Sequence, residues 1–363
     1  MNLMNSLLKK YGWNNIHSEL RTLRASDLQK NRTILFLIDA LWANSHWFVD
    51  EKYKKYFQHQ VVTSSYPCST TSAVTAVQTW LTPLNHGLLS RSQYMKAFNF
   101  VGKPLPYLKE KEAIENITWQ SEYFSDFASW YARMNVKSWF CIRQQYVNSA
   151  YTSKVASWAT QYGFWWLDDM PATVRKAIDK DNSFIYCYIE DYDSTSHKHG
   201  YNSYEAIQVL NDLFRRITNM IDSWMLDNFN ILITWDHGQT LVNSYVYLDD
   251  FLELHTMLRF KELPWDGRHR YIHLQDWKKE TFLKYFEAYM SEYFYLYSRQ
   301  EILENGLYGN WEISDEFEAS FWDYVIIAKW SAEICDDKQD DHKLWEHGWL
   351  SEDEMLVSLY SRL

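Results

Sequence analysis

The sequence predicts an α/β fold in which helices cover both faces of a mostly parallel sheet, as in a three-layer α/β/α sandwich. Three short apolar runs, at 33–38, 184–189 and 231–234, are each followed by acidic or histidine residues. Runs of this length that are apolar throughout indicate strands buried on both faces. A helical pattern between the second and third runs supplies the crossover that parallel strands require.

One large domain is expected, because 363 residues with 47% apolar content can bury a substantial core. No Gly/Ser-rich linker, repeat or low-complexity tract divides the chain. The segments at about 91–172 and 249–324 are more polar and aromatic, and we expect them to cover the site, the second as an inserted cap. The aromatic share of 18% is interpreted mainly as packing volume.

The elements follow in order along the chain. The first residues, MNLMNSLLKKYGW, have their lysines after only a brief apolar stretch, whereas a signal peptide has basic residues first and a longer apolar segment next. We interpret them as an amphipathic surface helix. The stretch after Thr70, TSAVTAVQTWL, indicates a buried helix whose amino end faces the site. A last helix is expected to begin at Ser351. The crossover helix shows helical spacing through Ala206, Leu210, Leu213, Ile217, Met220 and Trp224.

Metal-ligating side chains follow the three predicted strands. Ligands of open α/β sheets collect beyond the carboxyl ends of the strands, so these side chains are expected to converge on one edge. Carboxylate oxygens mixed with imidazole nitrogens suit zinc or manganese, and two such ions form a clamp for phosphoryl transfer. The candidate ligands are Asp39, Thr70, Asp193, His197, Asp236, His237 and His347.

Single members of this set have ordinary structural explanations. Asp193 and His197, four residues apart, are also compatible with a surface ion pair or a helix cap. Asp236 and His237 are adjacent and point to opposite faces of an extended strand, unless a turn near Gly238 lets both approach a metal. The combination is far less expected by chance than any one pair.

Asp39 and His347 carry similar alternatives. Asp39 is also compatible with a carboxylate that accepts backbone N–H bonds at a strand-to-helix turn. His347 is also compatible with a surface histidine, but apolar residues and a glycine follow it and help to seat it. We favour it over His342, which lies in the solvated run DDKQDDHK and remains a possible substitute.

The net charge limits the classes of binding partner that we expect, and the cysteine content indicates the cellular compartment. The net charge of −11 argues against a general nucleic-acid binder, which needs a basic face against the phosphates. A small anionic substrate remains compatible, because bound cations reverse the sign locally. No apolar run approaches the roughly 20 residues that cross a bilayer. Four scattered cysteines without a CxxC pair fit reduced thiols, so we expect a cytoplasmic protein.

The ordered set resembles the type I phosphodiesterase/nucleotide pyrophosphatase family of the alkaline phosphatase superfamily. The resemblance rests on Asp39 and the stretches YPCSTTSAVTAVQTWLTPLNHGLL, EDYDSTSHKHG, ITWDHGQT and EHGWLSEDEMLVSL. It implies an alkaline phosphatase-like fold around two divalent metal ions, zinc foremost. One ion would be held by Asp193, His197 and His347, and the other by Asp39, Asp236, His237 and the oxygen of Thr70.

The resemblance also implies a nucleophile. Thr79 and Pro83 match the Thr-Gly-x-x-Pro part of the family pattern, which places the nucleophile at Thr70, with Ser69 and Thr71 as register alternatives. The implied reaction cleaves a phosphodiester or pyrophosphate bond of a small substrate through a phosphothreonine intermediate. Coordination by a metal activates the hydroxyl, so no separate general base is needed.

Two departures from the family pattern bear on the turn after the helix and on the substrate. Trp80 stands where the pattern has glycine, which crowds the following turn. Nucleotide-cleaving members carry an asparagine shortly after the His-Gly that here is His86-Gly87, and this chain offers Ser90 and Arg91 instead. Arg91 is compatible with bidentate phosphate binding or with an ordinary surface cation.

Other readings of the same scaffold remain open. The chain is compatible with a phosphomonoesterase or phosphonate hydrolase, whereas it lacks the Cys-x-Pro-x-Arg pattern of sulfatases. An inactive binding scaffold is disfavoured, because every ligand position and the nucleophile are chemically intact. A local basic cluster is compatible with anion binding but is better explained as a salt-bridged surface turn. Its members are Gly267, Arg268, Arg270 and His273.

Overall fold

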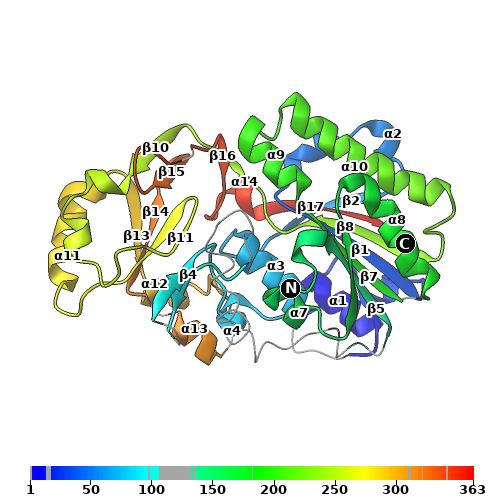
Figure 1. Ribbon diagram of the computed structural model, residues 1–363, viewed down its shortest axis with the longest axis horizontal. Helices are drawn as coiled ribbons and strands as arrows, with labels where there is room; N and C mark the ends of the chain where they lie inside the picture. Colours follow the sequence, from blue (N-terminus) through cyan, green and yellow to red (C-terminus); the bar gives the residue numbers. More distant parts are fainter. Residues whose placement is uncertain are drawn as a thin grey trace.

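The computed structural model describes residues 2–13, 18–96, 99–105, 131, 134, 136–181, 183–309, 312–320, 322–340 and 342–363. A seven-stranded sheet in the order β2-β17-β8-β1-β7-β5-β6 forms its centre (Figure 1). Its strands are β1 (Arg32–Ile38), β2 (Gln58–Thr63), β5 (Ser138–Arg143), β6 (Ala159–Phe164), β7 (Phe184–Ile189), β8 (Phe229–Trp235) and β17 (Leu356–Arg362).

The three predicted strands are β1, β7 and β8, and they lie side by side in parallel. Ile38 at the end of β1 is level with Ile189 of β7 and with Trp235 of β8. The carboxyl ends of the three strands therefore meet at one edge, as predicted. All residues of β7 and β8 are buried, which explains why their sequences are apolar throughout.

Helices pack on both faces of this sheet, and the fold is the predicted α/β sandwich. Ile34 and Phe36 of β1 belong to one core with α8 and α10, while Leu35 and Leu37 belong to the other core with α1 and α3. The alternation follows from the two-residue repeat of a strand. The helices around the sheet are α1 (Asn2–Lys10), α2 (Glu51–Lys54), α3 (Thr70–Thr79), α4 (Pro83–His86), α7 (Ala150–Val155), α8 (Met170–Asp179), α9 (Asp191–His199), α10 (Tyr204–Asp222) and α14 (Glu352–Met355).

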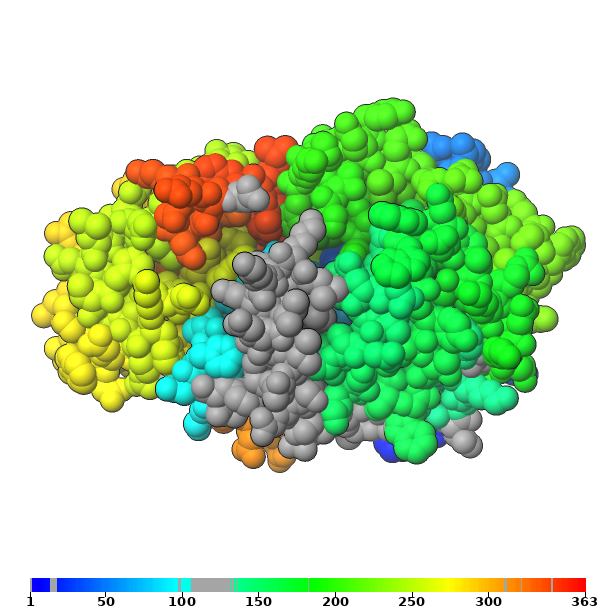
Figure 2. Space-filling model, in the orientation of Figure 1, coloured from blue at the N-terminus to red at the C-terminus, as the bar shows by residue number. Residues whose placement is uncertain are grey.

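A smaller region is built on a four-stranded antiparallel sheet in the order β11-β12-β14-β13. It lies beside the main sheet, as the yellow to red part of Figure 2 shows next to the green body. Most of it falls in the segment 249–324 that we expected to form a cap, although β14 runs beyond it. Its elements are β11 (Trp265–Asp266), β12 (His269–Ile272), α11 (Lys279–Tyr285), β13 (Phe294–Ser298), α12 (Arg299–Glu304), α13 (Asp315–Ala319) and β14 (Tyr324–Ala328).

Three two-stranded sheets complete the described part of the fold. They pair β3 with β4, β9 with β16 and β10 with β15. No helix within the described ranges is long and apolar enough to cross a membrane. The strands are β3 (Gln93–Met95), β4 (Phe100–Gly102), β9 (Thr240–Leu241), β10 (Ser244–Tyr247), β15 (Ala332–Cys335) and β16 (Trp345–Glu346).

The prediction that 91–172 covers the site as a whole is wrong for its second half. Strands β5 and β6 of this segment are part of the main sheet, where β5 pairs with β7. Strand β6 lies at the sheet edge and contains the polar residues Thr160 and Gln161, so it lacks the continuous apolar run that marked the central strands. Residues 106–130 of the segment lie outside the described residues.

Two helix predictions need correction at their ends. The crossover helix is α10, but it stops at Asp222, and Trp224 is exposed instead of extending the apolar face. The helix capped by Ser351 makes a single turn, after which the chain continues as β17. The adjacent residues Leu359 and Tyr360 are buried on opposite faces of the sheet, as successive residues of a strand are.

Candidate metal centre

The candidate ligands come from the loops at the carboxyl edge of the main sheet. Asp39 follows β1 directly, and the Asp236-His237 pair follows β8. Strand β7 leads into α9, which carries Asp193 and His197 one helical turn apart. The remaining histidine, His347, follows β16. The sequence predicted this convergence, and the structure brings all of these side chains together.

The ligands form two sets of three residues, and within each set the potential ligand atoms lie within 4.8 Å of one another. The two sets are neighbours, because the rings of His237 and His347 are 4.0 Å apart. Separate cations at these sets would lie side by side. The first set is Asp193, His197 and His347, and the second is Asp39, Asp236 and His237.

The three histidines are oriented alike. Each Nδ1 atom lies within hydrogen-bond distance of a backbone carbonyl: His197 contacts Trp345 at 2.6 Å, and His347 contacts Cys68 at 2.7 Å. His237 contacts the carbonyl of Gly238 at 3.0 Å. A carbonyl only accepts, so each Nδ1 carries the proton and each Nε2 offers a lone pair. Such backbone partners commonly orient histidines that bind metal.

The adjacent Asp236 and His237 both reach the site because the chain turns sharply after β8. Asp236 Oδ1 accepts the backbone N–H groups of Ala40 and His237, both at 3.0 Å. At the next position a Cβ atom would lie 2.0 Å from the carbonyl oxygen of Asp353, so only glycine fits there. Gly238 therefore permits the turn that the sequence interpretation required.

Burial and neighbouring negative charge make the two aspartates of the second set weaker acids than usual. Burial, together with the nearby carboxylates of Asp236 and Asp193, raises the pKa of Asp39 well above its ordinary value. Burial also raises the pKa of Asp236. Asp236 Oδ2 is buried and has no hydrogen-bond partner within the described residues. Uncompensated buried carboxylates of this kind fit a divalent cation, so the residues suit the ions that the family resemblance implies.

The first set has a different balance of charge. Burial opposes ionisation of Asp193, but the adjacent His197 outweighs it and lowers the pKa of the Asp193 carboxyl. Burial and the neighbouring His237 lower the pKa of His347 to about 4. Imidazole at His347 is therefore neutral at physiological pH, which is the state that ligates a metal.

Metal-free protein is expected to become less stable as pH rises, in a way that Asp39→Asn relieves. The folded state holds a proton on Asp39 that the unfolded chain releases above about pH 4, so the free energy of unfolding falls as pH rises. With a chelator at pH 8, the Asn variant should melt a few degrees above the wild type. The two melting curves should converge toward pH 4.

Zinc serves as the control for this experiment. It should raise the melting temperature of the wild type more at pH 8 than at pH 5, because ligands must be deprotonated to bind. The variant should gain less, since one ligand is gone. A difference between wild type and variant that does not change with pH would contradict the account.

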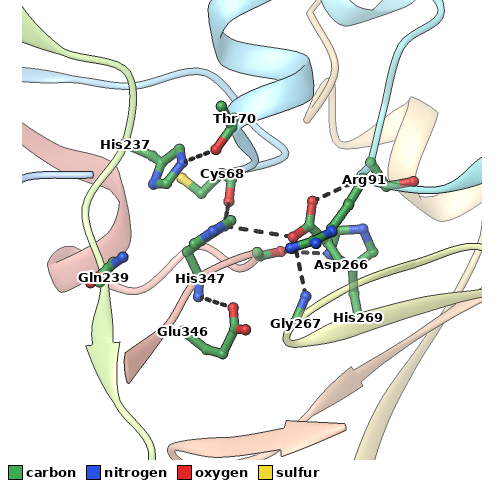
Figure 3. A network of polar contacts seen from close by, with 12 residues as sticks. Cys68, Thr70, Arg91, His237, Gln239, Asp266, Gly267, His269, Glu346 and His347 are labelled. Carbon is green, nitrogen blue, oxygen red and sulfur yellow. Dashed lines mark hydrogen bonds and ion pairs between the residues drawn. The ribbon is translucent and has the colours of Figure 1, made fainter. Parts of the chain in front are cut away.

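Thr70 places its hydroxyl against both the histidine and an aspartate of the second set. Its Oγ1 lies 3.1 Å from His237 Nε2 and 3.4 Å from Asp39 Oδ1, as Figure 3 shows for the histidine contact. It is the first residue of α3, whose unpaired N–H groups favour an anion beside it. Ser69 precedes the helix, and Thr71 is buried behind it. Of the three register alternatives, only Thr70 has such contacts to both the histidine and the aspartate.

A cavity of about 440 Å³ opens onto both ligand sets and Thr70. Arg91 and Lys343 line it, so the arginine does not lie on an open surface as an ordinary cation. The Ser90 hydroxyl instead bonds to the carbonyl of Ser92 at 2.6 Å and is fully buried. Apolar and aromatic side chains complete the wall, namely Val74, Leu105, Ile142, Tyr146, Tyr151 and Tyr188.

Several residues around the ligands escaped the sequence interpretation. Gln239 donates to Asp193 Oδ1 at 2.6 Å, and the Tyr188 hydroxyl bonds to Asp39. Asp266 and Glu346 form a third buried group with His347, which lies between Cys68 and Glu346 in Figure 3. Because His347 Nδ1 already bonds to the Cys68 carbonyl, these carboxylates surround the ligand and hold its position. Only Glu346, next to His347, had any local signal.

The basic cluster of the smaller region is buried, so its interpretation as a surface turn is wrong. Arg268 pairs with the buried Glu354 at 2.5 Å, and Arg270 donates to backbone carbonyls. His273 is also buried. Gly267 lies against Glu346, where a Cβ would lie 1.9 Å from the carboxylate. The cluster braces the loop that carries Asp266.

The choice of His347 over His342 agrees with the structure. His342 stacks on Tyr245 with ring centroids 4.2 Å apart, and it belongs to neither ligand set. Trp80, the departure after α3, adopts a left-handed conformation with φ of 72°. The helix therefore ends at the position where the family pattern has glycine.

Comparison with known proteins extends these observations. The model of the type I phosphodiesterase/nucleotide pyrophosphatase family matches residues 23–350. Ectonucleotide pyrophosphatase/phosphodiesterase family member 7 from Mus musculus and from Rattus norvegicus is 29% identical over 99 residues, or 26% of this chain. The match spans 22% of the length of these curated relatives.

Solved structures agree over a longer stretch. Murine ectonucleotide pyrophosphatase/phosphodiesterase 5 has a TM-score of 0.70 at 19% identity, covering 91% of this chain and 87% of that chain. The human form has a TM-score of 0.69 at 17% identity with the same coverage. These likenesses confirm the fold, and the family model covers most of the sequence. The chain belongs to the type I phosphodiesterase/nucleotide pyrophosphatase family.

Proposed function

We propose that the protein is a metal-dependent hydrolase that cleaves a phosphodiester or pyrophosphate bond of a small substrate. The observation that carries this proposal is the position of Thr70. Its hydroxyl lies 3.1 Å from His237, whose ring lies 4.0 Å from that of His347. A nucleophile thus stands at the border of two neighbouring ligand sets, and a cavity large enough for a small ester opens onto them.

Two divalent cations, zinc or manganese, would be held by the sets described above, with Thr70 joining the second. They would supply charge stabilisation for the attacking and leaving oxygens and lower the pKa of the Thr70 hydroxyl. Mixed carboxylate and imidazole donors favour these metals over magnesium or calcium, which prefer oxygen ligands. Zinc is proposed first, because each set has a small number of ligands and all of them are carboxylates or imidazoles, which zinc binds.

The protein's own residues position the reaction. The amino end of α3 directs N–H groups toward the phosphoryl oxygens beside Thr70. In-line attack forms a bond from Thr70 Oγ1 to phosphorus and breaks the bond to the leaving oxygen. Water then hydrolyses the phosphothreonine and releases the second product. Tyr188 and Gln239 hold Asp39 and Asp193 in place through hydrogen bonds during both steps.

Relatives support the nucleophile and the class of ligand. An inactive form of murine ectonucleotide pyrophosphatase/phosphodiesterase 5, in which alanine replaces a threonine, was solved in complex with AMP. That structure has a TM-score of 0.69 to this one at 18% identity. A nucleotide-like phosphate ester is therefore a reasonable first substrate, although this chain has Ser90 and Arg91 in the region where nucleotide-cleaving members carry an asparagine.

Phosphomonoester hydrolysis is the second candidate, and Arg91 is the observation that favours it. A monoester has one more negative charge than a diester, and a guanidinium in the cavity wall offers a bidentate partner. Phosphonate hydrolysis would use the same groups. An inactive scaffold is disfavoured, because every predicted carboxylate and imidazole ligand lies in one of the two sets.

Some broader proposals accompany the activity. We propose that the chain acts as one catalytic unit, because Asp266 of the smaller region reaches the cavity that the main sheet builds. All four cysteines are free and buried, which supports a reducing compartment such as the cytoplasm. The acidic chain supports a small phosphate ester over a nucleic-acid polymer as the partner.

A panel of aryl esters tests the proposed function. Bis(p-nitrophenyl) phosphate, p-nitrophenyl phosphate, the p-nitrophenyl ester of thymidine 5′-monophosphate and p-nitrophenyl sulfate are compared with zinc or manganese supplied. Turnover of the phosphate esters that depends on metal, with little turnover of the sulfate, is expected. Absence of phosphate-ester hydrolysis under all metal conditions would overturn the proposal.

A further inference from the structure

We infer that Arg91 and Lys343 form a subsite for a second anionic group, so that the preferred substrate carries more negative charge than a simple phosphodiester. This inference rests on the proposed function, since it concerns the same cavity. Both side chains line that cavity together with His347 and Asp193. The charge that they recognise is either a third ionised oxygen on the reacting phosphorus or a separate phosphate group.

Lys343 is tied closely to the first ligand set. The backbone N–H of Leu344 bonds to the carbonyl of His197 at 3.3 Å, so the lysine is anchored beside that ligand. Its side chain is 25% exposed and forms an ion pair with Glu346, which is fully buried. The ammonium group therefore lies at the boundary between the protein interior and the cavity.

Lys343 retains capacity for a ligand. An ammonium group has three N–H donors, and Glu346 is its one partner among the described residues. The other oxygen of Glu346 accepts the backbone N–H of His347 at 3.1 Å, so the carboxylate is committed to holding the lysine and the ligand loop. Two N–H donors of Lys343 are thus available to oxygen atoms in the cavity.

Arg91 is held at the same wall by its backbone. Its N–H donates to Asp266 Oδ2 at 3.2 Å, and Asp266 in turn lies 3.8 Å from His347 Nδ1 (Figure 3). Both cations line one cavity. Burial and the positive charge of Arg91 lower the pKa of the Lys343 ammonium group, but Glu346 and Asp193 outweigh them, so its pKa is raised and the group stays charged. An anionic group between the two cations would be attracted by both.

The chemistry of the wall selects the kind of ligand. A guanidinium and an ammonium group together favour phosphate oxygens, to which they donate charge-assisted hydrogen bonds. A cationic group such as a quaternary ammonium would be repelled. We therefore assign the subsite to a phosphate and not to a positively charged leaving group.

Matched substrates separate the possible sources of the second charge. With zinc supplied, kcat/KM is measured for methyl p-nitrophenyl phosphate, for p-nitrophenyl phosphate, and for thymidine 5′-(p-nitrophenyl phosphate) with and without a 3′-phosphate. The wild type should prefer either the monoester or the 3′-phosphorylated diester over its less charged counterpart by about tenfold or more. No preference in either pair overturns the subsite.

Substitution of the two cations then tests their role. Arg91→Gln and Lys343→Met should each lower kcat/KM for the more highly charged substrate by roughly ten- to a hundredfold, and change that for the less charged one by less than about threefold. The controls are Arg259→Gln and Lys338→Met, which remove exposed cations paired with Asp276 and Asp250. Equal losses on all substrates overturn the subsite.

Two further measurements keep the test decisive. Because Lys343→Met leaves Glu346 buried without its partner, Lys343→Met/Glu346→Gln is prepared as well, and it should show the same loss of preference. If no ester is hydrolysed, the proposed function fails, and calorimetric binding of pyrophosphate to zinc-loaded protein decides the subsite. At least tenfold weaker binding by the lysine variants supports it, and unchanged binding overturns it.

A separate set of residues carries a second inference, which concerns the tryptophans. Among the tryptophans that the structure describes, four adopt left-handed backbone conformations: Trp80, Trp158, Trp224 and Trp330 have φ of 72°, 73°, 63° and 52°. A bulky side chain is a genuine outlier in this region, which glycine occupies without steric cost. Trp158, Trp224 and Trp330 are also strongly exposed, at 83%, 79% and 66%.

The glycine and tryptophan content of the chain also supports glycine at such positions. The chain has 19 tryptophans and only 10 glycines, well below the glycine share of roughly 7% that is average for proteins. Trp80 takes the position after α3, where helices commonly end with a left-handed glycine. It is also the position where the family pattern has glycine. A shortage of glycine and an excess of tryptophan thus occur together, at positions with glycine geometry.

The geometry points to glycine as the natural residue at these four positions. A codon that one translation system reads as tryptophan and another reads as glycine would produce such an exchange wherever it occurs. We therefore expect protein isolated from its natural host to carry glycine at 80, 158, 224 and 330. Peptide mass spectrometry decides this directly: glycine masses support the inference, and tryptophan masses at all four positions overturn it.

The melting temperature of the tryptophan-containing protein and its variants gives an independent test. Trp158→Gly, Trp224→Gly and Trp330→Gly should each raise the melting temperature by a few degrees, because the backbone strain is relieved without loss of a buried contact. Alanine at the same positions is the matched control, since it removes the indole but keeps a Cβ atom. Glycine should exceed alanine at each position. Equal effects of the two would overturn the strain argument.

Discussion

Thr70→Ala is expected to abolish turnover, lowering kcat/KM by at least about a thousandfold. The reason is that Thr70 Oγ1 is the group placed 3.1 Å from His237 and 3.4 Å from Asp39, and alanine has no atom to replace it. The two aspartates and the histidine of the second set remain, so the metal content should change little. Ester hydrolysis and elemental analysis of the same preparation give the two readouts.

Thr71→Ala is the matched control for this experiment. Thr71 is adjacent in sequence and fully buried, and it does not line the cavity. Its removal should cost some stability but leave the rate within a few-fold of wild type. Thr70→Ser should keep part of the activity, because it restores a hydroxyl. Wild-type rates in Thr70→Ala, or loss of activity in Thr71→Ala alone, would show that the nucleophile is misassigned.

His347→Ala is expected to remove one of the two metal ions and most of the activity. The substitution deletes one of the three ligands of the first set. Only Asp193 and His197 remain there, and two ligands hold zinc poorly. The loss of kcat/KM should again be about a thousandfold. Elemental analysis should find about half the wild-type zinc, while circular dichroism shows that the sheet is intact.

The control variant is His342→Ala, five residues earlier in the chain. Its imidazole stacks on Tyr245 and contacts the Tyr247 hydroxyl at 3.2 Å, away from both ligand sets. It should retain full metal content and activity. A zinc content that is unchanged in His347→Ala, or halved in His342→Ala, would refute the assignment of the first set.

Much of the central fold was predictable because its signals are local. Strands β1, β7 and β8 are buried on both faces, and continuous apolar runs such as 184–189 follow directly from that environment. Asp39, Asp193, His197 and the Asp236-His237 pair come soon after these strands, so their sequence positions already indicated a common edge. The edge strand β6 could not be recognised, since a partly exposed strand needs no continuous apolar run.

The cavity wall was harder to predict because distant loops build it. Asp266 precedes a buried strand of the smaller region, and Lys343 lies in a run that reads as solvated. Nothing near Asp266 in sequence indicates a place beside His347, and Lys343, although it comes four residues before His347, gives no sequence signal that its side chain lines the cavity. Their role depends on how the smaller region packs against the main sheet, which is a property of the tertiary structure. The same holds for Arg268, whose buried partner Glu354 is far away along the chain.

Strand β17 has a consequence for how the molecule assembles during synthesis. It lies between β2 and β8 and pairs antiparallel with both, so β2 joins the sheet only through it. A ribosome makes β2 long before β17, and until β17 is made β2 has no partner in the sheet and the flank of β8 stays open. Such unpaired edges invite association between nascent chains. Completion of the sheet is therefore a late, long-range event, which favours slow folding and dependence on chaperones.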